Sequence, residues 1–119
     1  MPHWSPDGKQ IAFSGAKPGD PNRIYIIPAS QNARRDLGRG SDGICCPRWS
    51  PDGRWVIALS ADKQKLFLLD MSTQKWRQVA DKIGIIGYMT WSRDSKYVGF
   101  DTSSPSIQHF VACLPPMDK

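Results

Sequence analysis

The stretch "WSPDGKQIAF" at residues 4–13 returns as "WSPDGRWVIAL" at 49–59 and as "WSRDSKYVGF" at 91–100. Each copy places a Trp before a turn sequence and an apolar run after it. In the first two copies Pro presets φ for a type I turn, Asp accepts local backbone hydrogen bonds, and Gly adopts the left-handed conformation at no steric cost. The phrase therefore predicts a tight turn that joins two antiparallel strands.

Further segments of strand-like composition surround each copy. The segments "RIYIIPAS" at 23–30 and "KLFLLDMS" at 65–72 follow the first two copies, and "GICCPR" at 43–48 and "IIGYMT" at 85–90 precede the second and third Trp. A period in the low forties with four short strands per unit is typical of a β-propeller blade. We therefore predict an all-β fold, a partial β-propeller of about two and a half to three four-stranded antiparallel blades.

The repeat also predicts that the chain is a single incomplete domain made of three blades. Blade one is expected at 1–42, blade two at 43–84 and blade three at 85–113, with a tail at 114–119. The innermost strand of blade one is expected to be missing or reduced to residues 2–4, and blade three is expected to lack its outer strand. The other strands are predicted near 10–14, 23–28, 33–37, 44–49, 55–60, 65–70, 75–80, 86–91, 97–101 and 108–113.

Residues that recur in register are interpreted as structural. We expect each repeated Trp to fill the space between neighbouring sheets, with its indole N–H donated to a carbonyl at a strand end. The third copy departs from the pattern, because Arg93 replaces Pro and Ser95 replaces Gly. A non-Gly residue in the left-handed region costs about 1 kcal/mol, so we expect a looser or differently shaped turn there. The structural residues of the repeat are Trp4, Pro6, Asp7, Gly8, Trp49, Pro51, Asp52, Gly53, Trp91 and Asp94.

The charge and the cysteines suggest no special chemistry. The 119 residues carry a formal charge of +5, but the basic residues are spread along the chain and indicate a solvated face, so no nucleic-acid contact is expected. Only Arg34, Arg35 and Arg39 come close to a cluster. Cys45, Cys46 and Cys113 are expected as free thiols, with a Cys45–Cys46 or a Cys45–Cys113 disulfide as the alternatives.

No motif predicts catalysis, a metal or a cofactor. The stretch "GRGSDG" at 38–43 matches a dinucleotide fingerprint but has a strand after it instead of a helix, so a loop between blades is the preferred interpretation. His3 and His109 lack partners at a known spacing and are interpreted as surface or strand-end residues. We therefore expect a non-enzyme with no catalytic, metal or cofactor-binding residues.

The repeats resemble those of the TolB-like, WD-like β-propellers, which carry "W-S-P-D-G-K-x-I-A-F" phrases like the one at 4–13. Such propellers occur in TolB, in prolyl-oligopeptidase-type peptidases and beside Ser/Thr kinases or winged-helix regulators of bacteria. The resemblance implies a module that binds a protein or peptide partner, or alternatively an accessory propeller of an enzyme or regulator, or a truncated fragment with no independent function. Contacts are expected in the loops 15–22, 38–44, 61–64 and 82–88, with Trp76, Arg34 and Arg35 as possible contact residues.

The resemblance also implies a ring larger than this chain, because propellers of this family have six to eight blades. The absent blades are expected from a longer parent chain or from self-association. No signal peptide or membrane-inserting run is visible, so a cytoplasmic location is the default and a periplasmic one remains open for the parent protein.

Overall fold

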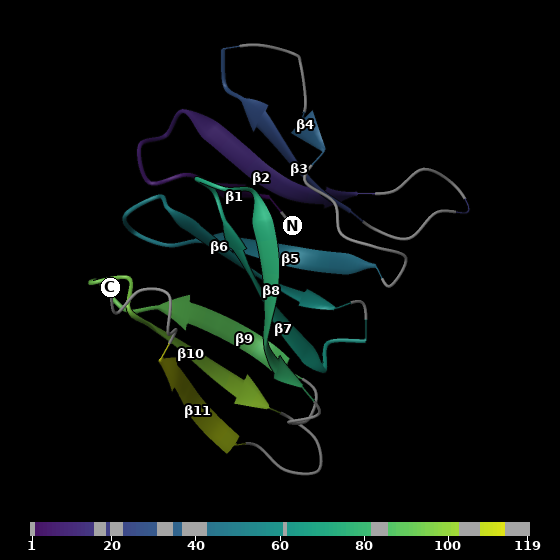
Figure 1. The fold of residues 1–119 in the computed structure, drawn as a ribbon, viewed down its shortest axis with the longest axis vertical. Helices are drawn as coiled ribbons and strands as arrows, with labels where there is room; N and C mark the ends of the chain where they lie inside the picture. Colours follow the sequence, from purple (N-terminus) through teal and green to yellow (C-terminus); the bar gives the residue numbers. More distant parts are fainter. Residues whose placement is uncertain are drawn as a thin grey trace.

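The computed structural model describes residues 2–15, 19, 23–30, 35–36, 43–60, 62–81, 86–102 and 108–113, and within these ranges no side chain is described for 35–36, 80–81, 88 and 108–113. The described residues form strands and turns only, arranged as three antiparallel sheets that stack like blades (Figure 1). The all-β prediction is thus confirmed. The strands are β1 (His3–Trp4), β2 (Gln10–Gly15), β3 (Arg23–Pro28), β4 (Arg35–Asp36), β5 (Ile44–Trp49), β6 (Trp55–Ser60), β7 (Lys65–Asp70), β8 (Lys75–Asp81), β9 (Ile86–Trp91), β10 (Tyr97–Thr102) and β11 (Gln108–Cys113).

The strands follow the chain order within each sheet. Blade one has the order β1-β2-β3-β4, blade two has the order β5-β6-β7-β8, and blade three is a three-stranded sheet of β9, β10 and β11. The three sheets fall within the ranges 1–42, 43–84 and 85–113 that the repeat defined. The innermost strand of blade one is a two-residue strand at His3–Trp4, and its outermost strand, Arg35–Asp36, is shorter than the segment 33–37 that the sequence suggested.

The repeated phrase forms the same hydrogen-bonded turn each time. In blade two the Gly53 N–H donates to the Ser50 carbonyl at 2.9 Å, and the Ser50 hydroxyl donates to Asp52 Oδ1 at 2.6 Å. The same carboxylate accepts from the Arg54 N–H, and the Ser50 Oγ accepts from the Trp55 N–H. The Ser–x–Asp unit thus satisfies the backbone of its own turn, which explains why these polar residues recur.

A further Ser–x–Asp unit, which we did not identify in the sequence, closes the β6–β7 hairpin. Ser60 Oγ donates to Asp62 Oδ1, while the Gln64 N–H and the Lys65 N–H donate to Asp62 and Ser60 respectively. Lys63 has a φ of 62° in the position that Gly53 takes in the repeated phrase. The signal was present as "SADKQK" at 60–65, but it lacks the Trp, Pro and Gly that mark the other copies.

The expectation of a looser third turn was wrong. Ser95 adopts a φ of 63°, and its N–H donates to the Ser92 carbonyl at 3.0 Å, as in the other copies. The Ser92 hydroxyl donates to Asp94 Oδ1, and the Tyr97 N–H donates to Ser92 Oγ. Ser95 is buried, and its Oγ accepts a hydrogen bond of 3.1 Å from the Asp52 N–H of blade two. That contact between blades contributes about 0.5–1.5 kcal/mol, which is comparable with the cost of the left-handed conformation.

The hydrophobic core lies on both faces of blade two. Its strand β6 is buried along all six residues because alternate side chains pack against different neighbours. On the side of blade three, Ile57 and Leu68 join a cluster with Val98 and Phe100. On the side of blade one, two clusters join Ala12, Ile24 and Ile26 to Trp49, Ile44, Val56, Ala58, Phe67 and Leu69.

The repeated tryptophans lie between blades in two of three cases. The Trp49 indole Nε1 donates to the His3 carbonyl at 3.2 Å, and the Trp91 Nε1 donates to the Arg48 carbonyl at 3.1 Å. Each acceptor is the residue just before the Trp of the preceding blade. Trp4 departs from the expectation of core packing, because its side chain is 54 % exposed. The reason is geometric, since no described residue covers that side of blade one.

The expectation of free thiols at Cys45 and Cys46 was wrong, because the two residues form a vicinal disulfide. In a regular strand adjacent residues point to opposite faces, so this pairing requires an irregularity in β5. The register of β5 and β6 shifts between Cys45 and Arg48, and Cys46 has a φ of 64°, so both cysteines pack against the cluster shared with blade three. The Cys113 side chain lies outside the described residues, as does that of His109.

Candidate binding pocket on the second blade

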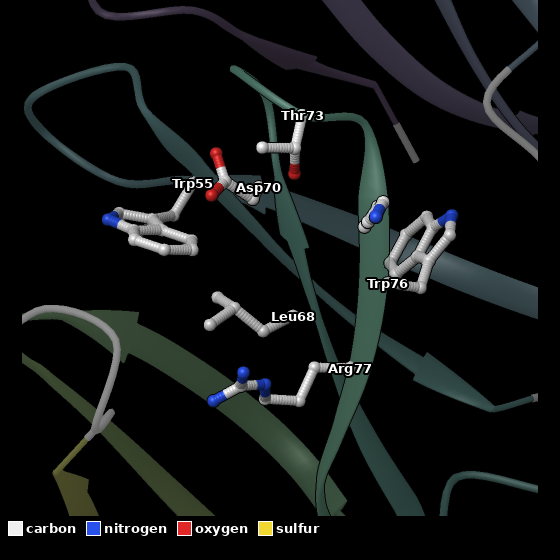
Figure 2. Close-up of a pocket in the computed structure, with 7 residues that line it drawn as sticks. Trp55, Leu68, Asp70, Thr73, Trp76 and Arg77 are labelled. Carbon is white, nitrogen blue, oxygen red and sulfur yellow. The ribbon is translucent and has the colours of Figure 1, made fainter.

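A pocket of about 240 Å³ opens on blade two, on the outer strands β7 and β8 (Figure 2). Leu68 and Trp55 form an apolar floor, and both side chains are nearly fully buried. Because ligand pockets for drug-sized molecules span roughly 300–1,000 Å³, this one has room for about one side chain of a larger ligand.

The strand register places the polar lining of the pocket. Asp70 of β7 pairs with Lys75 of β8, and Leu68 pairs with Arg77. Directly paired residues project to the same face of a sheet, so the two cations lie beside the apolar floor and the carboxylate. In Figure 2 the Arg77 side chain extends on the side where Leu68 and Trp55 lie. Thr73, in the turn between the strands, completes this end of the lining.

Asp70 is held ionised and in place by its neighbours. Its Oδ1 accepts hydrogen bonds from the Ser72 N–H and the Ser72 hydroxyl, and its Oδ2 lies 3.6 Å from Arg54 Nη2. Burial raises the pKa of Asp70, but the Ser72 hydrogen bonds and the Arg54 charge outweigh it and hold the pKa below its ordinary value. Arg54 also lies over the Trp55 ring, 4.6 Å from the ring centroid, which ties the carboxylate to the apolar floor.

The two cations that line the pocket differ from Arg54, which lies beside it. Lys75 and Arg77 are exposed, and neither forms an ion pair within the part of the chain that the structure describes. An exposed cation with no internal partner is available to a carboxylate or phosphate from outside. The pocket therefore combines an apolar floor with two exposed cations.

The lining contains no set of catalytic groups. No Ser, Cys or His is among the residues that line it, and Asp70, as an ionised carboxylate with its pKa lowered, is a poor general base. Among the described residues, no group of three His, Cys, Asp or Glu side chains could hold a metal ion.

The contact residues named from the sequence have different positions. Trp76 contributes to the pocket, but its ring points away from Leu68 in Figure 2 and packs against the clusters shared with blade one. Arg34 lies outside the described residues, and Arg35 belongs to β4 with no side chain described. Of the expected contact loops, most of 15–22, 38–44 and 82–88 also lies outside the described residues.

Sequence reasoning missed Asp70, Lys75 and Arg77. The loop 61–64 lies between β6 and β7, whereas the pocket lies at the other end of β7, beside the β7–β8 turn. The available signal was the spacing of Lys75 and Arg77, which are two residues apart and therefore share one face of their strand. Its meaning depends on the pairing with Leu68 and Asp70, which the sequence does not state.

His3 and the turn carboxylates serve the structure. The Trp49 N–H donates to His3 Nδ1 at 3.0 Å, and burial, with a contribution from the Arg48 charge, lowers the pKa of His3. Hydrogen bonds from the Ser5 and Ser92 hydroxyls lower the pKa of Asp7 and Asp94 in their turns. A second hollow, of about 360 Å³, lies between the turns at 5–10 and 49–53, where these side-chain hydrogen bonds are internal to each turn.

No protein-family profile matches the chain. Two curated relatives do: the uncharacterized peptidase YuxL of Bacillus subtilis, 38% identical over 56 residues, and dipeptidyl-peptidase 5 of Porphyromonas endodontalis, 23% identical over 123 residues. The matches cover 47% and 97% of this chain but only 8% and 18% of those proteins. The chain therefore spans less than a fifth of either relative.

Solved structures match over nearly the whole chain. TolB from Acinetobacter baumannii superposes with a TM-score of 0.75 at 22% identity, covering 96% of this chain and 29% of that one. The Pyrococcus horikoshii acylaminoacyl peptidase superposes with a TM-score of 0.68 at 20% identity, covering 86% of this chain and 16% of that one. At these identities the likeness shows the fold, and the TolB-type β-propeller fold expected from the repeats is confirmed.

Proposed function

Starting from the TolB-type propeller fold, we propose that this chain is a non-enzymatic segment of a β-propeller that binds a protein or peptide partner at the pocket of blade two. The observation that carries the proposal is the pair of exposed cations, Lys75 and Arg77, beside the apolar floor of Leu68 and Trp55. A propeller fold serves many unrelated functions, so the argument rests on this site.

The pocket chemistry indicates which kind of ligand would fit. An apolar side chain of the partner fills the space over Leu68, and a carboxylate beside it meets Lys75 and Arg77. Asp70 is ionised and already bound by Ser72 and Arg54. Its negative charge repels a ligand carboxylate and favours placement of that carboxylate away from Asp70. The partner is therefore an acidic peptide or protein surface that presents an exposed apolar residue.

A peptide array with acidic and apolar positions tests this proposal. Peptides that bind the unaltered chain should bind Arg77→Ala with roughly tenfold lower affinity. A charge-assisted hydrogen bond contributes about 1.5–3 kcal/mol, and solvent screening reduces this value at an exposed site. Arg93→Ala, which removes an exposed arginine from the turn of blade three, is the matched control and should bind as the unaltered chain does. Equal losses for both variants would show that attraction to net charge, and not the pocket, explains binding.

A second candidate function is an accessory propeller of a larger peptidase. It is favoured by the names of both curated relatives, which are peptidases, and by the structural likeness to acylaminoacyl peptidase. In that case the pocket of blade two would contact the substrate or the hydrolase domain. The reading frame on either side of the coding sequence tests this candidate, because an in-frame hydrolase domain would support it. Purified chain is expected to hydrolyse no peptide or ester substrate.

A further inference from the structure

The two ends of the blade stack expose residues that are buried inside it. The large exposed apolar side chains among the described residues are Trp4, 54 % exposed, and Tyr97, 42 % exposed. Trp4 holds the repeat position of Trp49, which is 5 % exposed between blades one and two. Tyr97 holds the position of Trp55, which is 3 % exposed beneath blade three. Each end aromatic therefore lacks the neighbour that covers its counterpart.

The rear face of blade one, made of Trp4, Ile11, Phe13 and Ile27, has the composition of a blade–blade contact. Ala12 packs toward blade two, so its neighbours Ile11 and Phe13 project to the opposite side, where both are only half-buried. Ile27 pairs with Ile11 and shares that side.

Blade three shows what such a rear face contacts. Val98 and Phe100 hold the repeat positions of Ile11 and Phe13, and both are buried against blade two. The same pattern of a β-branched residue and a phenylalanine is thus buried at one blade and half-buried at the other. The rear face of blade one is chemically equipped to pack on the blade that would precede it.

The front face of blade three, made of Thr90, Tyr97 and Gly99, can receive such a blade. Gly99 and Thr90 are cross-strand partners and lie on the side opposite Val98. In blade one the same position is taken by Ala12, which accommodates blade two. A small residue at this place therefore already supports one blade contact in this chain.

The indole hydrogen bonds fix the register. Trp49 donates to the residue before Trp4, and Trp91 donates to the residue before Trp49. Continuing the series, Trp4 would donate to the residue before Trp91, which is Thr90. We propose that two copies of this chain associate head to tail, with the rear face of blade one of one copy on the front face of blade three of the other. The contact is heterologous, so it adds copies until the rotation closes or the ends are blocked.

Blocking each face separately tests the proposal. The purified chain should show a mass above the 13.3 kDa monomer that rises with concentration in sedimentation or light scattering. Trp4→Glu blocks the rear face and Tyr97→Glu blocks the front face, and each variant alone should be monomeric. Mixed together, the two variants should form a dimer, because each retains the face that the other has lost.

A matched control and clear contrary outcomes complete the experiment. Lys63→Glu introduces the same residue at an exposed turn of blade two, away from both faces, and should associate as the unaltered chain does. Circular dichroism confirms that the variants keep their strands. An unaltered chain that stays monomeric at all concentrations would overturn the proposal. So would a Trp4→Glu and Tyr97→Glu mixture that stays monomeric, or a Trp4→Glu variant that still associates with itself.

Discussion

At the scale of single residues, Ser95 shows how a contact between blades compensates a local cost. Its left-handed backbone is unfavourable by about 1 kcal/mol, and its Oγ accepts from the Asp52 N–H of blade two. We expect Ser95→Ala to lower the free energy of unfolding by about 1–2 kcal/mol, because it loses the hydrogen bond and keeps the strain. Ser95→Gly loses the same bond but relieves the strain, so it should change stability by less than about 1 kcal/mol. Urea titrations of the two variants measure this order, and an Ala variant as stable as the Gly variant would contradict it.

His3 makes the junction of blades one and two sensitive to pH. Its neutral Nδ1 accepts the Trp49 N–H, and burial lowers its folded pKa below the ordinary value of 6.5. Since the unfolded chain binds the proton more readily, this contribution to stability is present above pH 6.5 and is lost as the pH falls toward and through the folded pKa.

Thermal unfolding of the unaltered chain and of His3→Asn, measured between neutral and mildly acidic pH, tests this prediction. The Asn side chain can accept a hydrogen bond but does not titrate in this range. The decrease in melting temperature toward low pH should therefore be smaller in His3→Asn. Parallel curves would mean that the carboxylates, such as Asp7 and Asp94, account for the whole decrease.

At the scale of strands, the sequence predicts positions better than it predicts local irregularities. The bounds of β5 and the start of β6 follow from Gly43 and from the turn at 51–53, and β6 and β7 follow from their apolar runs. The left-handed Cys46 does not follow, because a bulge arises from how β5 registers on β6 and leaves no mark in composition. The pocket is missed for a similar reason: Lys75 and Arg77 gain their meaning from the pairing of β8 with β7.

The bulge of β5 leads to a prediction about the cysteines. We expect the chain purified without reductant to have an intact mass lower by one hydrogen molecule than the reduced chain, because Cys45 and Cys46 are joined. Peptide mapping should recover both cysteines in one oxidised peptide, and Cys46→Ser should abolish the mass difference. Recovery of Cys45 linked to Cys113 would contradict the vicinal pairing.

At the scale of the whole molecule, the exposure of Trp4 shows where repeat reasoning ends. A repeat identifies equivalent positions, but burial of an equivalent residue depends on a neighbouring blade being present. Trp49 and Trp91 have such a neighbour among the described residues, and Trp4 does not. The fold was therefore predictable from the phrase at 4–13, while the surroundings of each copy required the arrangement of all three sheets.

This difference between the central blade and the two end blades predicts the order in which the blades unfold locally. Blade two is covered on both faces, so the amides of β6 and β7 should exchange with deuterium most slowly. Strands β2 and β10 each belong to a blade with one face that no described residue covers. Exchange mass spectrometry of the Tyr97→Glu variant, with its front face blocked, tests this order without self-association. In the unaltered chain at high concentration, head-to-tail contact should slow exchange in β2 and β10 and leave β6 unchanged, because β6 is already covered. Equal protection of all three blades in the blocked variant would contradict the stacking of independent sheets. In the unaltered chain, slower exchange confined to β2 would indicate that two rear faces pair symmetrically instead of head to tail.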